Sequence, residues 1–188
     1  GVFMKKILLY FGDYQEKKPI LETILSDMQI AYRILTDTDL QQPIGYLLGI
    51  QDKAQQEVTQ TMHMHIDLMF LDGFSDEEIQ ELNARMKAQG VSMPRKAMRT
   101  KHNETWRLID LLEEIEKEHA YFQTLEEIQK LLMASSELQM DIYTPDSWKA
   151  YESAFIQAYE VLQNQSEPDV AKAALTTLTQ AKAALQKR

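Results

Sequence analysis

Carboxylates that directly follow short apolar runs are the residues of this sequence best suited to chemistry. Asp13 follows KKILLYFG (5–12), and Asp72 ends the run IDLMFLDG (66–73). A third polar group, Thr100–Asn103, follows residues 91–100. Carboxylates, a lysine, a histidine and helix N-termini at one edge of a sheet could bind a small ligand. The residues that we predict to form such a site are Asp13, Asp72, Ser75, Arg99, Lys101, His102 and Asn103.

Alternating strand-like and helix-like segments are expected to position these residues. Apolar runs predict strands within residues 5–12, 31–37, 66–73 and 91–100, and helical spacing predicts helices from Pro19, Ser75 and Asn103. Repeated strand–helix–strand units predict a small α/β fold with a four-stranded, mainly parallel sheet and flanking helices. We predict the strand order 2-1-3-4. In such sheets, ligands bind beyond the carboxyl ends of the strands, so Asp13 and Asp72 are expected to converge there.

Five basic residues crowd into MPRKAMRTKHNETWR (93–107), although the chain carries a formal net charge of −9. One interpretation is an edge strand whose charges discourage aggregation. A second is anion binding at the helix start at Asn103. A third is nucleic-acid binding, which the pI of about 5.0 and the lack of an exposed aromatic platform disfavour. The basic residues are Arg95, Lys96, Arg99, Lys101 and Arg107.

Metal and nucleophile motifs are weak in this sequence. His63 and His65 point to one side if MHMH (62–65) is extended, but no third ligand lies nearby in the sequence. A phosphoryl-accepting receiver would need an acid pair after the first strand, where only Asp13 stands. No G-x-S-x-G nucleophile motif is present. We therefore predict no metal, no cofactor and no catalytic residue.

Composition limits the class of protein. The 188 residues include no cysteine, which excludes disulfides and thiolate metal sites and suits a reducing compartment. No apolar run reaches the roughly 18 residues of a membrane span, and GVFMKKILLYFGDY lacks the pattern of a secretory signal. We expect a cytoplasmic protein with no membrane association.

From residue 124 the pattern is helical only. TLEEIQKLLMASSELQ begins with the capping box Thr124–Glu127, and Thr144 caps a helix that opens with Pro145. The last helical segment repeats small residues at Ala173, Ala174, Ala181 and Ala184. We predict a three-helix antiparallel bundle. The expected domains are residues 1–122 and 123–188.

Two parts of the chain resemble known families. PIGYLLG (43–49), FLDGFSDEEIQELNARMKAQGV (70–91) and RKAMRTKHNETWRLIDLLEEI (95–115) together resemble an uncharacterised bacterial domain of unknown function, over most of residues 5–122. That resemblance implies no activity. The turn YTPDSW (143–148) and the run AFIQAYEVL (154–162) resemble the FIVAR helical module. FIVAR modules are common in bacterial surface proteins, as spacers or carbohydrate-associated units.

These observations favour a non-enzymatic cytoplasmic protein that acts in interaction or regulation, with an unknown protein partner. The alternative is a domain that binds a small anionic ligand at the carboxyl edge of the sheet, as a sensor or an enzyme. The alternative requires the predicted site residues to meet in one pocket.

Overall fold

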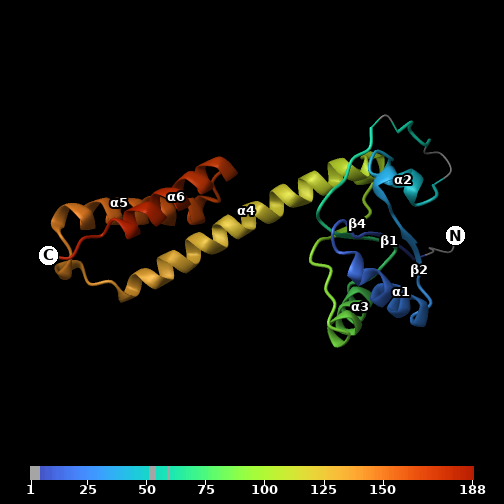
Figure 1. The fold of residues 1–188 in the computed structure, drawn as a ribbon, viewed down its shortest axis with the longest axis horizontal. Coiled ribbons are helices and arrows are strands. Elements are labelled where there is room, and N and C mark those ends of the chain that lie inside the picture. Colours follow the sequence, from blue (N-terminus) through green and yellow to red (C-terminus); the bar gives the residue numbers. More distant parts are fainter. Residues whose placement is uncertain (1–4, 51–53, 59) are drawn as a thin grey trace. The chain divides into compact units, whose positions relative to one another are not determined.

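The computed structural model describes residues 5–50, 54–58 and 60–188. It divides into two compact units, one ending at Ile115 and the other spanning Glu116–Arg188. The first unit is an α/β fold and the second is helical, as predicted. The division lies seven residues before the predicted domain boundary. Figure 1 shows the elements of both units.

The sheet of the first unit has four strands in the order β2-β1-β3-β4, which confirms the predicted order. The strands are β1 (Lys6–Tyr10), β2 (Ala31–Ile34), β3 (Leu68–Asp72) and β4 (Lys96–Met98). β1 pairs with β2 in parallel and β3 pairs with β4 in parallel, but β1 and β3 are antiparallel. The sheet is therefore mixed: two of its three strand pairs are parallel, in keeping with a mainly parallel sheet, but the central pair β1–β3 is antiparallel, whereas the expected meeting of Asp13 and Asp72 required it to be parallel.

The connection between β2 and β3 explains the reversal. Parallel strands need a crossover, usually a full helix, whereas an antiparallel strand needs none. Among the described residues of this connection, the helices are η2 (Asp37–Asp39) and α2 (Ile44–Leu47), which are too short to carry the chain back along the sheet. The described residues 54–58 and 60–67 then lead into β3 without forming a helix.

Helices cover both faces of the sheet (Figure 1). Alternate residues of the central strands point to opposite faces, so Ile7 and Leu9 belong to one core and Leu8 and Tyr10 to the other. The first core packs α1 (Lys18–Asp27) and α3 (Asp76–Ala88) on the sheet. The second core packs α2 and the start of α4 (Leu108–Ala134). Two short 3-10 turns complete the unit, η1 (Gln15–Lys17) and η3 (Asn103–Thr105).

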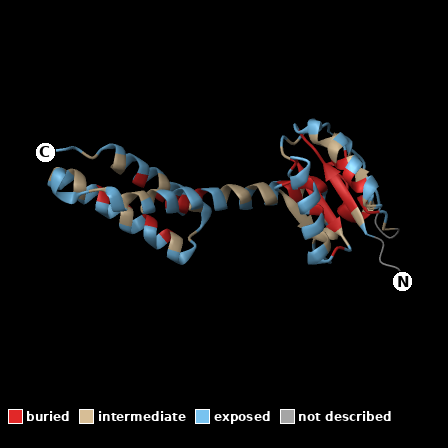
Figure 2. Cartoon of the chain, turned by 90° about the horizontal axis from the view of Figure 1, so that it is seen from below, coloured by how far each residue is buried: buried red, intermediate tan, exposed pale blue. Residues whose placement is uncertain are grey.

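The second unit packs the C-terminal part of α4 with α5 (Pro145–Asn164) and α6 (Pro168–Ala183). The turn between α4 and α5 contains η4 (Ser135–Glu137) and η5 (Met140–Ile142). Small residues at the helix contacts, such as Ala158, Ala171 and Ala174, are fully buried, and Figure 2 shows the buried positions facing inward. Neighbouring helices run antiparallel: Ser135 bonds Tyr151, while Tyr121 reaches Ser166.

Three local predictions about the helices are wrong. The hydroxyl of Thr124 donates to Ala120 O inside α4, so it caps no new helix, and α4 is continuous across the expected break. Asn103 begins the short η3 rather than α4, which starts at Leu108. Thr38 and Gln41 have the spacing of a capping box, which predicts a helix cap at Thr38, but Thr36 occupies the cap of η2, in a capping box with Asp39. Among the described residues, no helix combines the length and apolarity of a membrane span.

Candidate functional site

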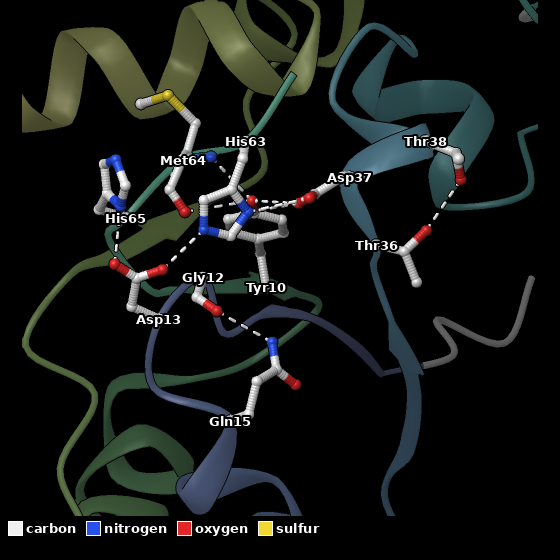
Figure 3. Close-up of polar contacts among 10 residues, drawn as sticks. All are labelled: Tyr10, Gly12, Asp13, Gln15, Thr36, Asp37, Thr38, His63, Met64 and His65. Carbon is white, nitrogen blue, oxygen red and sulfur yellow. Dashed lines mark hydrogen bonds and ion pairs between the residues drawn. The ribbon is translucent and has the colours of Figure 1, made fainter. Parts of the chain in front are cut away.

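Two histidines and a carboxylate meet beyond the end of β1 (Figure 3). Asp13 Oδ1 lies 2.7 Å from His63 Nε2, and Asp13 Oδ2 lies 2.7 Å from His65 Nδ1. The two imidazole rings are in edge contact, with centroids 5.2 Å apart. His63 and His65 therefore do share one side of an extended segment. We call Asp13, His63 and His65 the His–Asp cluster.

The far side of His63 is held by a second carboxylate. His63 Nδ1 lies 2.9 Å from Asp37 Oδ2 and 3.1 Å from Asp37 Oδ1. The hydroxyl of Tyr10 donates to Asp37 Oδ1 at 2.7 Å and accepts from the backbone N–H of Met64 at 3.0 Å. Tyr10 is 2% exposed, so a rigid core residue of β1 fixes both Asp37 and the histidine segment.

Gly12 allows the histidine segment to approach β1. Its φ of +55° lies in the left-handed region. A Cβ on Gly12 would lie 2.3 Å from Ile66 O and 2.7 Å from Met64 O. The backbone N–H of Asp13 donates to His65 O at 3.3 Å across the same contact. The absence of a side chain at position 12 therefore permits the contact that forms the cluster.

A buried ion pair fixes the next residues of the segment. The carboxylate of Asp67 is fully buried, with Lys17 Nζ 2.5 Å from its Oδ2 and Arg95 Nη1 3.5 Å from its Oδ1. Earlier in the connection, the buried amide of Gln42 accepts from Gln56 N at 2.8 Å and donates to Gln56 O at 2.7 Å. The segment is thus anchored on both sides of His63 and His65.

The cluster changes the proton affinities of its members. Hydrogen bonds from His63 and then His65 lower the pKa of Asp13. Hydrogen bonds to Asp13 and then Asp37 raise the pKa of His63. Burial, followed by the bond to Asp37, raises the pKa of the Tyr10 hydroxyl. These contacts therefore favour the charged form of His63, which lies between two carboxylates, and the neutral form of Tyr10.

The arrangement also brings three potential metal ligands together. One oxygen of Asp13 and one nitrogen from each of His63 and His65 all lie within 4.8 Å of one another. No candidate third ligand lies near these histidines in the sequence, but the fold brings Asp13 to them from 50 residues away.

The predicted site residues do not meet in one pocket. In the register of β1 and β3, Asp72 lies opposite Lys6, at the start of β1, whereas Asp13 follows the end of β1. The antiparallel direction of β3 thus places the two carboxylates at opposite edges of the sheet. Asp72 instead pairs with Arg99, at 3.3 Å, and Ser75 is the cap of α3, accepting from Glu78 N.

The residues after β4 mainly stabilise their own turn. Asn103 Oδ1 accepts from Thr100 N at 2.8 Å, and Asn103 Nδ2 donates to Met98 O at 2.8 Å. The ring of His102 contacts Trp106, and Lys101 is exposed in the turn. Arg99 Nε lies 3.0 Å from Glu104 Oε2. The charge of Arg99 is therefore already opposed by two carboxylates.

The basic segment 93–107 is largely paired within the fold. β4 is an edge strand, as predicted. Arg95 reaches buried Asp67, and Arg107 forms two bonds of 2.9 Å with Asp110. Lys96 donates to Met93 O, and burial lowers the pKa of its amine. These pairings account for Arg95, Arg99 and Arg107 without a nucleic acid.

Sequence reasoning missed Tyr10, Asp37 and the joining of Asp13 with the two histidines. The alternation of His63 and His65 was a usable signal, because it places both rings on one side. The missing information was which strand end faces the segment, and this depends on the direction of β3.

Comparison with known proteins supports part of the resemblance. Residues 67–122 match the family described as Domain of unknown function (DUF3783). No curated protein and no solved structure matches the chain. The matched region begins at Asp67, so PIGYLLG and the His–Asp cluster lie outside it. Over residues 67–122 the chain is similar to a family of unknown function.

Proposed function

We propose that this is a non-enzymatic cytoplasmic protein of interaction or regulation, which binds a protein partner through its helical unit. The observation that carries the proposal is the distribution of exposed apolar side chains. Ten large ones are exposed among the described residues, and seven of these belong to residues 116–188: Phe122, Met133, Met140, Ile142, Ile156, Tyr159 and Val170. Aromatic residues and methionine are enriched where proteins bind one another.

Helix α5 shows how the two sides of this unit differ. Ala154, Ala158 and Val161 are buried against the neighbouring helices. Ile156 and Tyr159, which are three residues apart on the helix, are 50% and 49% exposed. The small residues bring the helices close together, and the larger apolar residues remain outside. Covering an exposed apolar side chain with a partner lowers the free energy of the complex, because it removes apolar surface from water.

The proposal includes the resemblance of the helical unit to the FIVAR module. In it, the helical unit is a FIVAR-like bacterial module that acts as an interaction surface. Binding of a small anionic ligand near Asn103 has less support, because Arg99 is paired with Asp72 and Glu104.

Site-specific photo-crosslinking in the cells that make the protein would test the proposal. A photoreactive residue at Tyr159 should give a discrete protein adduct, and Ile156→Glu should reduce that adduct strongly. The same residue at Lys87, an exposed position of α3, is the matched control. Absence of an adduct at Tyr159, an equal yield at Lys87, or insensitivity to Ile156→Glu would each contradict the proposal.

A further inference from the structure

We propose that Asp13, His63 and His65 form a binding site for a first-row divalent transition-metal ion of the Zn²⁺ class, with Asp37 supporting His63. This inference concerns the α/β unit and is independent of the partner surface proposed for the helical unit. It begins with the donor set, which is two imidazole nitrogens and one carboxylate oxygen within 4.8 Å of one another.

The donor types select the class of ion. Imidazole suits Zn²⁺, Co²⁺, Ni²⁺ and Cu²⁺, whereas Mg²⁺ and Ca²⁺ prefer sites made of oxygen. Two histidines and one carboxylate are a known three-ligand set for zinc, with the fourth position left to water or another ligand. The side chain of His65 is 81% exposed, so solvent can reach that position.

The distances permit an ion after a small adjustment. Ligand bonds of about 2.0–2.1 Å in a tetrahedron place neighbouring donor atoms roughly 3.3 Å apart. The two contacts of Asp13 are now 2.7 Å, as expected where a hydrogen-bonded proton joins imidazole to carboxylate. The side chain of Asp13 is 53% exposed and can move back by this difference. The ion would thus take the place of the shared protons.

A second, independent observation is the partner of the other nitrogen of His63. Histidines that bind metals usually donate their remaining N–H to a carboxylate or carbonyl, which fixes the tautomer and the ring orientation. His63 has this arrangement, with Nδ1 2.9 Å from Asp37 Oδ2 and Nε2 directed to Asp13. Tyr10 in turn holds Asp37 by a 2.7 Å bond. The charges also balance, because Asp13 and Asp37 together offset a dication.

An ion in this site would join two separate parts of the chain and connect to a third through the bond between His63 and Asp37. Asp13 follows β1, Asp37 begins η2 after β2, and His63 and His65 precede β3. Residues 54–58 and 60–67 form no helix or strand, so an ion that links Asp13 to His63 and His65 would restrain this part of the connection.

Titration of the intact, tag-free chain with Zn²⁺ in a calorimeter tests the proposal, with Co²⁺ as a visible probe of coordination. We expect one ion per chain and the intense visible bands of four-coordinate Co²⁺. His65→Ala should weaken binding at least about tenfold, because it removes a ligand. Asp37→Asn should weaken it by about 10–100-fold, the usual effect of losing a supporting carboxylate. His102→Ala, which removes a histidine outside the cluster, should bind like the unchanged chain.

The variants are designed to remain folded. His65 is mainly exposed and its side chain contacts Asp13 and the ring of His63, so its truncation leaves the core unchanged. Far-UV circular dichroism without metal should confirm this. Three results would overturn the proposal: no binding of Zn²⁺ or Co²⁺ by the folded chain, equal affinity in His65→Ala, or equal losses in His65→Ala and His102→Ala.

Discussion

His63 Nε2 and Asp13 Oδ1 lie 2.7 Å apart, although 50 residues separate them in the chain. The contact depends on a glycine beside Asp13, on a buried tyrosine that holds the histidine segment, and on a buried aspartate just beyond it. Each of these supports can be changed separately, and the following predictions test them.

Gly12→Ala should destabilise the first unit strongly. Its Cβ would lie 2.3 Å from Ile66 O, which is backbone and cannot rotate away. We expect a loss of about 3 kcal/mol or more, in the range of severe substitutions. Gly90→Ala is the control, because Gly90 also has positive φ, +70°, but open space around it. The free energy of unfolding of Gly90→Ala should fall by only about 1–2 kcal/mol, the cost of a side chain in the left-handed backbone conformation. Equal losses in urea unfolding would contradict the role given to the close contact.

Asp67→Asn should be more damaging than the loss of a surface ion pair. Asp67 is fully buried between Lys17 and Arg95, so neutralising it leaves two largely buried cations opposed by no carboxylate at that position. Breaking a buried pair in this way costs about 3–5 kcal/mol.

Glu126→Gln is the matched control for Asp67→Asn. Glu126 and Lys130 are both exposed and 3.8 Å apart, so the loss should be at most about 1 kcal/mol. Chemical denaturation of both variants gives the comparison. An Asp67→Asn variant as stable as Glu126→Gln would show that the buried pair is unimportant.

His63 should titrate above its ordinary pKa of about 6.5 in metal-free protein. Asp13 and Asp37 stabilise its charged form, so its folded-state pKa exceeds the unfolded value. The resulting stabilisation is fully present below pH 6.5 and disappears as the pH rises through the raised pKa. For Asp13 the sign is opposite, because its pKa is lowered: that stabilisation is present above its ordinary pKa and disappears as the pH falls through the lowered one.

Imidazole resonances in NMR, recorded with a chelator, give the His63 pKa directly. Asp37→Asn should bring that pKa closer to 6.5, since one of its two carboxylate partners is removed. A His63 pKa at or below 6.5 in the unchanged protein would contradict the hydrogen-bonded geometry. An unchanged His63 pKa in Asp37→Asn would show that Asp37 does not form the hydrogen bond to His63.

Ala174→Leu should destabilise the helical unit, whereas Ala173→Leu should not. Ala174 is fully buried between helices and Ala173 is exposed. Overpacking a close helix contact costs about 1–3 kcal/mol, and a surface change lies within about 0.5 kcal/mol. Thermal unfolding of the two variants measures the difference. Equal melting temperatures would mean that α6 packs through another face.

The sequence was informative about elements and less so about their directions. Strand-like segments were recognised at all four strands, and the predicted strand order is correct. The direction of β3 was wrong because repeated strand–helix–strand units were expected to join parallel strands, whereas the described part of the connection before β3 contains only the short helices η2 and α2. Local pattern cannot distinguish a helix that crosses a sheet from a turn that reverses the chain, and this error placed Asp72 near Asp13.

The predicted helix start at Thr124 was wrong because a local pattern has two possible structures. Thr124 and Glu127 have the spacing of a capping box, but a threonine inside a helix can instead bond the carbonyl four residues before it, as Thr124 does with Ala120. The His–Asp cluster was hidden by distance along the chain. Nothing near His63 in the sequence indicates Asp13, and the antiparallel pairing of β1 with β3 is needed to bring them together.

A crystal grown with Zn²⁺ and measured at the zinc absorption edge tests the central claim most directly. The account predicts an anomalous peak within about 2.0–2.2 Å of Asp13, His63 and His65, with Asp37 still bonded to the far nitrogen of His63. A peak elsewhere, or none in a crystal that shows the His–Asp cluster ordered, would contradict it.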